Sequence, residues 1–464
     1  MGLSFGGESR LLLTFYGDDF TGSTDAMEGL AMAGVPAVLF LSPPDEEQIA
    51  RYPGVAAVGV AGTSRSRTPD WMDRELPSVF RRLRDLGAPL CHYKTCSTFD
   101  SAPTVGSIGR AAEIGGDVFG GAVLVLVGVP KHKRFVVFSN LFAAASFSGD
   151  REIFRIDRHP TMSRHPVTPM TEGDLRLHLA RQTSRRIVGF DFLKMRTGDA
   201  DAALDRVMAE EADLVVLDTF DEATTRVAGR LIAGRGAKRP TFLVGSSGVE
   251  YALTEHLTQA GLLPLLKPPG PTRPAEKLAA VCGSCSPVTE AQIRWAEANG
   301  YVLLGMDTVK AVESEENPAF MGEMTDAAVS ALETHVGVIL HTARGREDPR
   351  IDQTREALRK RGLGDAESAA VLGGICGRIL RAVVAKSGVR RVVLAGGDSS
   401  SYAAQALGIE ALEVAASLVP GAPLCCVHAA DPVVNRLEIV LKGGQVGDPE
   451  FFGHVLRGHV EDKG

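Results

Sequence analysis

Short runs of apolar residues recur along the chain, and most of them end in glycine, aspartate or serine. Uninterrupted runs of this kind are typical of strands that are buried on both faces of a sheet. Segments with helical spacing follow them, for example residues 202–210 and 290–298. This alternation predicts an α/β fold with mainly parallel sheets between layers of helices. The runs that we interpret as strands are 11–16, 55–60, 123–127, 214–217, 241–244, 337–340 and 392–394.

The length of the chain predicts more than one domain. It has 464 residues, whereas single hydrophobic cores stop growing at about 250–300 residues. The clearest break is LLPLLKPPGPTRPAEK, residues 262–277, whose five prolines cannot continue a helix or a central strand. We therefore expect two α/β/α layered domains, at residues 1–265 and 277–464, joined by a proline-rich linker at 266–276.

Composition excludes some classes of function. The 50 basic and 57 acidic residues give a net charge of −7, which is unfavourable for non-specific binding of nucleic acid. The first apolar run is too short for a secretory signal, and the run near residues 121–129 is too short to cross a membrane. The seven cysteines are scattered through the chain. We expect a soluble, cytoplasmic protein with reduced thiols.

Two adjacent carboxylates, Asp18 and Asp19, stand where the first predicted strand ends. Ligands of parallel sheets bind beyond the carboxyl ends of the strands, so this position favours a role in function. Neighbouring carboxylates repel each other, and their burial would serve hydroxyl recognition, Mg²⁺ binding or general-base catalysis. The alternative is that they cap the following helix. The sequence alone leaves both interpretations open.

Polar side chains gather again in CHYKTCSTFDS, residues 91–101, after another apolar lead. A lysine among hydroxyl groups suits an anion such as a carboxylate, although a solvated loop would have similar residues. Arg164, which precedes a proline-containing loop, could also reach a ligand. The candidates for substrate binding are Lys94, Ser97, Thr98, Asp100 and Arg164.

The C-terminal half contains glycine-rich strand ends. In VVLAGGDSSS a buried strand stops at Gly396 and Gly397, and Asp398 begins a helix. Glycines let the backbone approach a phosphate, and a helix N-terminus favours negative charge. The chain has neither a GxxxxGK[ST] nor a GxGxxG motif, so a bound nucleotide would be held by a different kind of glycine-rich loop. The CxxC of Cys282 and Cys285 is one pair only, whereas zinc needs four ligands.

Together these motifs resemble the four-carbon acid sugar kinases, a two-domain family first catalogued as a domain of unknown function. YGDDFTGSTDA is similar to the opening motif of the family, and GSCSPVT is similar to its Gly-Ser loop. AGGDSSS and LKGGQVGDPEFF are similar to its two remaining C-terminal motifs. All four motifs occur in the family order across nearly the whole chain.

This resemblance implies an N-terminal domain that binds a sugar acid, a C-terminal domain that binds ATP, and an active site in the cleft between them. The resemblance also implies transfer of phosphate from ATP to a terminal hydroxyl. For such a reaction we expect Mg²⁺ to bridge the phosphates and Asp19 or Asp18 to act as the catalytic base. No metal ligand and no oligomeric state follow from the resemblance, and a homo-oligomer is possible. The nucleotide residues that it implies are Ser286, Gly396, Gly397, Asp398, Ser399 and Gly444.

One departure from the family pattern affects the expected substrate. Many members have an acid-Ser-Thr-Leu-Arg-Gly run, and here the run is CSTFDS, with Asp100 in place of the arginine. The change of charge suggests a related acid, oxidised or branched, such as 3-oxo-isoapionate. The alternatives are a non-catalytic protein that senses sugar acids and an NAD(P)-dependent sugar-acid dehydrogenase. The absence of GxGxxG from the sequence argues against the dehydrogenase.

Overall fold

The structure is a computed structural model, and two compact units can be distinguished within it. The N-terminal unit comprises the chain up to Asp18, Gly29–Val38 and Ser42–Pro268, and the C-terminal unit comprises Asp19–Glu28, Leu39–Leu41 and the chain from Pro269 onward. Residue 266 of the predicted linker, and the ends of both predicted domains, lie outside the described residues. The described residues are 11–145, 152–165, 167–210, 212–263, 267–313, 318–364 and 367–460.

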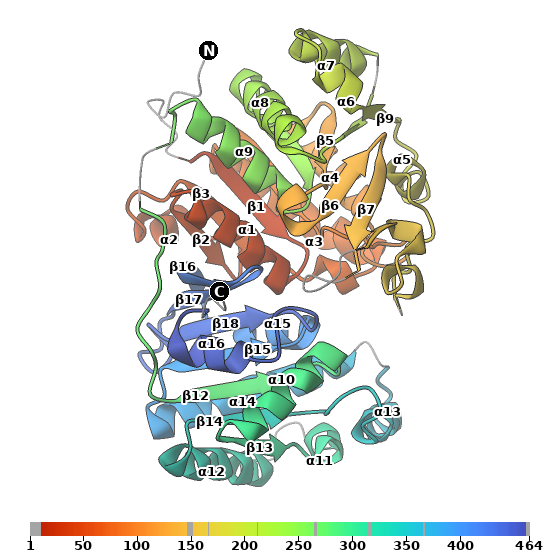
Figure 1. Ribbon diagram of the computed structural model, residues 1–464. Coiled ribbons are helices and arrows are strands. Elements are labelled where there is room, and N and C mark those ends of the chain that lie inside the picture. Colours follow the sequence, from red (N-terminus) through yellow and green to blue (C-terminus); the bar gives the residue numbers. More distant parts are fainter. Residues whose placement is uncertain are drawn as a thin grey trace. The chain divides into compact units, whose positions relative to one another are not determined.

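The N-terminal unit is built on a parallel sheet with the strand order β3-β1-β4-β11-β5-β10-β9 (Figure 1). A small antiparallel sheet, β6-β7-β8, accompanies it. The strands are β1 (Leu13–Gly17), β2 (Ala37–Phe40), β3 (Ala57–Ala61), β4 (Leu90–Lys94), β5 (Val123–Leu126), β6 (Arg134–Val137), β7 (Asn140–Ala144), β8 (Ile153–Arg155), β9 (Ile187–Phe190), β10 (Leu214–Leu217) and β11 (Thr241–Gly245). The helices up to residue 259 are α1 (Phe20–Met32), α2 (Glu46–Ala50), α3 (Pro69–Asp85), α4 (Ile108–Phe119), α5 (Leu175–Leu179), α6 (Phe192–Met195), α7 (Ala200–Ala209), α8 (Glu222–Lys238) and α9 (Gly248–Gln259). The first part of α1, up to Glu28, and the end of β2, from Leu39, belong to the C-terminal unit.

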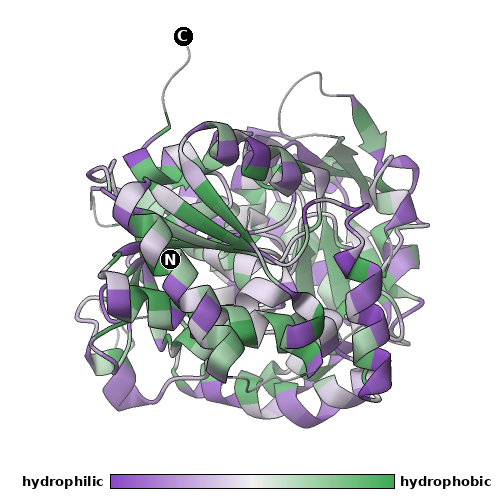
Figure 2. Cartoon of the chain, turned by 90° about the horizontal axis from the view of Figure 1, so that it is seen from below, coloured by the Kyte–Doolittle hydropathy of each residue, from purple (hydrophilic) through white to green (hydrophobic). Residues whose placement is uncertain are grey.

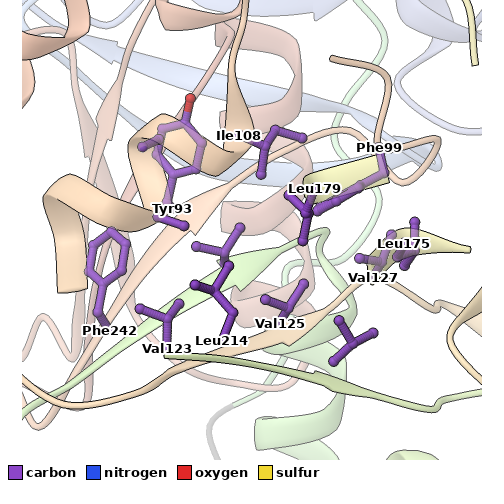
Figure 3. Packing of buried hydrophobic residues seen from close by; sticks show 14 of the residues in the cluster. Tyr93, Phe99, Ile108, Val123, Val125, Val127, Leu175, Leu179, Leu214 and Phe242 are labelled. Atoms are coloured by element: carbon purple, nitrogen blue, oxygen red, sulfur yellow. The ribbon is translucent and has the colours of Figure 1, made fainter. Parts of the chain in front are cut away.

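Helices cover both faces of this sheet, with α3 and α4 on one face and α8 and α9 on the other (Figure 1). The amphipathic helices α3 and α4 bury their apolar stripes against β4, β5, β10 and β11 in one core cluster. Figure 3 shows part of this cluster, to which Val123 and Val125 of β5, Leu214 of β10 and Phe242 of β11 contribute side chains. The strands are apolar on both faces because both faces are covered.

The C-terminal unit has the strand order β13-β14-β12-β15-β18-β17-β16. The strands from β13 to β18 in this order are parallel, and β17 and β16 continue the sheet antiparallel. The strands are β12 (Leu278–Cys282), β13 (Tyr301–Gly305), β14 (Gly337–His341), β15 (Arg391–Ala395), β16 (Ala411–Val419), β17 (Ala422–His428) and β18 (Glu438–Lys442). The helices are α10 (Pro287–Ala298), α11 (Thr308–Glu313), α12 (Pro318–Thr334), α13 (Arg350–Lys360), α14 (Ser368–Ser387), α15 (Asp398–Leu407) and α16 (Phe451–Arg457).

The longest helix, α14, is long and apolar enough by composition to cross a membrane. It packs instead against α12, α15 and β12, and half of its residues are buried there. Figure 2 shows the general pattern, with apolar residues concentrated on the strands and polar residues mainly on helices and loops. We therefore assign α14 to the core of the C-terminal unit.

The predicted α/β fold with mainly parallel sheets is confirmed, and each predicted strand coincides with an observed one to within a few residues. The small sheet β6-β7-β8 was not predicted. Its first hairpin turns at Phe138 and Ser139, which have φ values of 48° and 63°, where glycine or asparagine would be the usual signal. The carboxylate of Asp218 stabilises this turn by accepting the backbone N–H groups of Phe138 at 2.7 Å and Ser139 at 2.9 Å.

Two glycines of α8 test how closely the helices pack. A Cβ at Gly229 would collide with the backbone carbonyl of Ala252 in α9, whereas at Gly234 it would make only ordinary contacts. We expect Gly229→Ala to lower the free energy of unfolding by about 1–3 kcal/mol because of overpacking. Gly234→Ala should raise it by up to about 1 kcal/mol because alanine favours the helix. Urea denaturation of both variants measures this, and equal effects would contradict the packing assignment.

Candidate functional site

The two aspartates at the end of β1 have different surroundings. Asp19 caps α1, since its Oδ1 accepts the backbone N–H of Gly22 at 2.5 Å and its Oδ2 accepts the Thr21 hydroxyl at 3.4 Å. Asp18 is held through its backbone, because its N–H donates to the Lys94 carbonyl at 2.9 Å and its carbonyl accepts the N–H of Arg65 at 3.1 Å. Both side chains are buried. The capping alternative is thus realised at Asp19.

The loops that follow β1, β3, β4 and β11 are tied to one another at the carboxyl edge of the sheet. Lys94 is paired in register with Gly17 on one side and Gly245 on the other. The carbonyl of Gly245 accepts two hydrogen bonds from Thr95, one from the backbone N–H at 2.6 Å and one from the side-chain hydroxyl at 3.0 Å. The Lys94 side chain is buried at this edge, and its Nζ donates to the Thr95 carbonyl at 3.1 Å. The Lys94 ammonium is therefore held by the backbone of the loop that follows β4.

Asp100 forms a buried ion pair with Arg65, which lies in the loop after β3. Nη2 of Arg65 contacts Oδ1 at 3.0 Å and Oδ2 at 2.9 Å, and the Thr98 hydroxyl donates to Oδ1 at 2.5 Å. Burial alone would raise the pKa of Asp100, but the charge of Arg65 and the Thr98 hydrogen bond outweigh it and lower the pKa to about 2. Asp100 therefore stays ionised and organises the two loops.

A third segment joins this cluster through Thr168. Its hydroxyl donates to Oδ2 of Asp100 at 3.0 Å, and its backbone N–H donates to Nδ1 of His165 at 3.1 Å. Burial lowers the pKa of His165, which favours the neutral ring that can accept this hydrogen bond. The predicted ligand Arg164 ends a short 3₁₀ turn with its side chain exposed. Thr168 is the residue of this segment that reaches the strand ends.

The structure thus brings several of the predicted substrate residues to one edge of the sheet. Lys94, Thr98 and Asp100 meet there with Asp18, and Ser97 lies half-buried on the same loop. The sequence reasoning missed Arg65. Its signal was present, because GTSRS directly follows the apolar run of β3, at the position where parallel sheets carry their functional residues. The roles of these residues in binding a substrate stay predictions.

In the C-terminal unit, three strands end in small residues that are also tied together. The N–H of Gly283, after β12, donates to the Ala395 carbonyl at 2.8 Å. The N–H of Gly396, after β15, donates to the Lys442 carbonyl at 2.8 Å. The hydroxyl of Ser400 then donates to the Gly396 carbonyl at 2.7 Å, which fixes the first turn of α15. These loops form a small-residue cradle at the carboxyl ends of β12, β15 and β18.

Ser286 connects two sides of this cradle. Its hydroxyl accepts the N–H of Thr289 at 3.1 Å, which caps α10, and it also contacts the carbonyl of Gly444. The Thr289 hydroxyl donates to the same Gly444 carbonyl at 3.1 Å. The loop after β18 is therefore attached to the first turn of α10, so Ser286 and Gly444 lie together as the nucleotide prediction requires.

A cavity of about 290 Å³ opens between the cradle and α14. This volume is close to the lower end of the range of small-molecule sites. Its polar side is the start of α15, and its apolar side is formed by α14 and β12. The residues that line it include Gly283, Gly397, Asp398, Ser399, Leu372 and Cys376. A phosphate group would meet the N-terminus of α15 at the polar side, and a flat apolar ring would fit the other side.

Cys282 is completely buried in the core, and burial raises the pKa of its thiol to about 12, so it does not act as a thiolate.

Among the described residues, no group of three or more His, Cys, Asp or Glu side chains is arranged to hold a metal ion. Mg²⁺ commonly uses one or two carboxylates together with substrate phosphates, and Asp398 at the cradle fits that pattern.

Comparisons with known proteins agree with this division into two parts. The family described as a sugar-binding N-terminal domain matches residues 13–253, and the family described as a nucleotide-binding C-terminal domain matches residues 279–452. The 3-oxo-isoapionate kinase of Paraburkholderia graminis is 47% identical over 458 residues, which cover 97% of this chain and 95% of that protein. The 3-oxo-tetronate kinase of Cupriavidus necator is 28% identical over 97% of both chains.

Solved structures support the fold. A Salmonella typhimurium protein, described as a putative tRNA synthase, has a TM-score of 0.74 at 23% identity and covers 96% of this chain and 98% of its own. A Haemophilus influenzae protein has a TM-score of 0.66 at 20% identity and covers 95% of this chain and 98% of its own. At these identities the likeness concerns the fold alone.

The Asp100 pair makes stability depend on pH in a predictable direction. The folded-state pKa of about 2 lies below the ordinary value of 3.8, so the pair stabilises the fold above about pH 4 and loses this contribution as the pH falls towards 2. At about 1.4 kcal/mol per pKa unit, Asp100→Asn should lower the free energy of unfolding by about 2 kcal/mol at neutral pH. Urea denaturation should show the difference from the parent protein shrinking below about pH 4.

The matched control for this prediction is Asp326→Asn, which removes an exposed ion pair with Lys386. Exposed pairs contribute about 0–1 kcal/mol, so this variant should differ little from the parent protein at any pH. If Asp100→Asn were as stable as Asp326→Asn at neutral pH, the structural role of the buried pair would be disproved.

Proposed function

Because the chain belongs to the four-carbon acid sugar kinase family, we propose that it is an ATP-dependent kinase that phosphorylates a terminal hydroxyl of a small sugar acid. The substrate that we propose is 3-oxo-isoapionate. The observation that carries this choice is the 47% identity to a 3-oxo-isoapionate kinase, against 28% to 3-oxo-tetronate kinases, each over nearly the whole chain. We also propose that the protein acts in the cytoplasm, where ATP is available.

The C-terminal unit supplies the features that ATP needs in this proposal. Phosphoryl transfer depends on positioning the nucleotide and on neutralising the charge of its phosphates. The N-terminus of α15 offers a favourable dipole at Asp398 and Ser399, and the glycines of the cradle permit close approach of phosphates. Mg²⁺, held by Asp398 and the phosphates, would supply additional positive charge when bound. Leu372 and Cys376 would contact the base.

The N-terminal unit supplies the features that the acid needs. The buried ammonium of Lys94 would pair with the substrate carboxylate, since a buried charge favours an opposite charge close by. Asp18 is assigned as the base that accepts the hydroxyl proton. Asp19, the other candidate, already uses its Oδ1 to accept the N–H of Gly22, which favours a role in orienting the start of α1.

The departure at Asp100 fits a functional enzyme in this proposal. Its charge is matched by Arg65 within the same unit, so the change of sequence does not leave an uncompensated carboxylate in the acid site. Arg65 keeps about a quarter of its side chain exposed and is a further candidate for binding the acid. The expected position of the active site in a cleft between the domains, and the oligomeric state, remain predictions.

The proposed substrate can be tested with purified protein, MgATP and a panel of acids that includes 3-oxo-isoapionate, 3-oxo-tetronates, threonate and erythronate. We expect release of ADP, with a kcat/KM for 3-oxo-isoapionate at least about tenfold above that for the unbranched acids. Contacts between the protein and the extra group of a branched substrate give discrimination of this size. A higher value for a 3-oxo-tetronate would overturn the choice of substrate. Absence of turnover with every acid would favour the sensor, and turnover only with NAD(P) would favour the dehydrogenase.

Substitution of the two aspartates tests the choice of base. Asp18→Asn should lower kcat by about 10²–10⁴-fold with little change in KM, because it removes a general base. Asp19→Asn should keep most of kcat and raise KM, because it weakens the cap that orients α1. Steady-state kinetics of both variants decide the assignment. A larger loss of kcat in Asp19→Asn would reverse it, and full activity of both variants would disprove the role of the pair.

A further inference from the structure

Lys442, the last residue of β18, is a completely buried lysine beneath the cradle. Its Nζ donates to the hydroxyl of Thr289 at 3.0 Å and to the carbonyl of Gly443 at 2.9 Å, and it lies 5.6 Å from the centre of the Phe451 ring. Buried lysines are rare because the loss of hydration disfavours their charge. A lysine retained in this position therefore needs a physical explanation.

The partners of Lys442 connect two parts of the cradle. Thr289 lies in the first turn of α10, and Gly443 begins the loop after β18. The Thr289 hydroxyl has a single proton, which it donates to the Gly444 carbonyl at 3.1 Å, so it acts as acceptor towards Lys442. The ammonium group thus completes a chain of hydrogen bonds that holds the first turn of α10 against the loop after β18.

The groups that face Lys442 come from three other elements. They are the Cys282 thiol of β12, the Thr289 hydroxyl of α10 and the Phe451 ring of α16. Burial raises the pKa of Cys282 to about 12, so the thiol carries no charge at neutral pH. Burial lowers the pKa of Lys442 to about 8. The lysine therefore changes its charge within the pH range that an enzyme tolerates, whereas its neighbours do not.

We propose that Lys442 is a positioning residue of the nucleotide site, whose ammonium group keeps the Ser286 and Gly444 loops in place for the phosphates of ATP. This inference rests on the proposed function only in assigning a nucleotide to the cradle. When the proton leaves, the amine keeps two N–H donors but loses its positive charge and its attraction to Phe451. The loops are then held less firmly, and the phosphates also lose a nearby positive charge.

The experiment is a calorimetric titration of the full-length protein with the magnesium complex of a non-hydrolysable ATP analogue, at pH values from about 7 to about 9.5. Kd of the parent protein should rise by about tenfold across this range, as expected for loss of a hydrogen-bonded charge. Lys442→Met should bind about tenfold more weakly at pH 7 and show no such rise. Lys442→Arg, which stays protonated throughout, should bind without the rise.

Thr289 gives a second pair of variants that leaves the lysine in place. Thr289→Val removes the hydroxyl that accepts from Lys442 and donates to Gly444, so binding at pH 7 should weaken by about tenfold. Thr289→Ser keeps the hydroxyl and should bind like the parent protein. Circular dichroism checks that each variant is folded. This pair, together with the pH series of the parent protein, tests the inference even if no lysine variant folds.

Two results would overturn the inference: a Kd of the parent protein that is constant across the pH series, or a rise that persists in Lys442→Met. Equal binding by Thr289→Val and Thr289→Ser would also contradict it. Because the titration contains no acid substrate, it is independent of phosphoryl transfer. Turnover of a sugar acid with a pH-independent Kd would reject the role of Lys442 alone, whereas a pH-dependent Kd without turnover would reject the kinase proposal alone.

Discussion

Hydrogen bonds between the loops at the carboxyl edge of each parallel sheet are the constraint on which the rest of this structure depends. A parallel sheet brings the ends of all its strands to one edge, where each backbone group must find a partner once it is buried. In the N-terminal unit the loop after β1 is tied to those after β3 and β4 through Asp18. In the C-terminal unit Gly283 and Gly396 tie the loops after β12, β15 and β18 in the same manner. Polar side chains at this edge are therefore positioned by rigid strands.

The buried charges follow from this arrangement. Asp100 is balanced by Arg65, and two threonine hydroxyls complete its hydrogen bonds. Lys442 is compensated differently within the described part of the chain: its partners there are the oxygens of Thr289 and Gly443 and the ring of Phe451. The first group keeps its charge over the whole neutral range, and the second is close to titration. The two units thus stabilise buried charge in different ways, one with an opposite charge and one with hydrogen-bond acceptors and an aromatic ring.

The family relationship and the geometry support each other. The match to sugar-binding and nucleotide-binding parts covers nearly the whole chain. Each part has its own type of residue at the strand ends: carboxylates and an ammonium in one, small residues and a helix N-terminus in the other. The replacement at Asp100 is the feature that looked least compatible with activity. Because Asp100 pairs with Arg65, its charge is balanced and the two residues connect the loops after β3 and β4.

Most of the strands and helices could be predicted from the sequence because the patterns that indicate them are local. Uninterrupted apolar runs located the parallel strands, and the spacing of apolar residues located helices such as α7 and α10, since burial on both faces leaves a direct trace in the chain. The motifs at Asp18, Gly396 and Gly444 predicted functional sites, and the structure places these residues just after strands β1, β15 and β18. The hairpin at Phe138 left no such trace, because its turn is stabilised by the distant carboxylate of Asp218.

Only the tertiary structure decided how the polar residues at the strand ends are used. In the sequence the two adjacent aspartates are equivalent candidates, whereas in the fold the Asp19 carboxylate caps α1. Asp100 stood out as an unmatched charge until the fold brought Arg65 to it from a loop 35 residues away. Lys442 became informative only once its burial and its contact with Thr289 were known. The physical reason is the same in each case, since burial and pairing with distant residues are properties of packing, which the order of residues along the chain does not display.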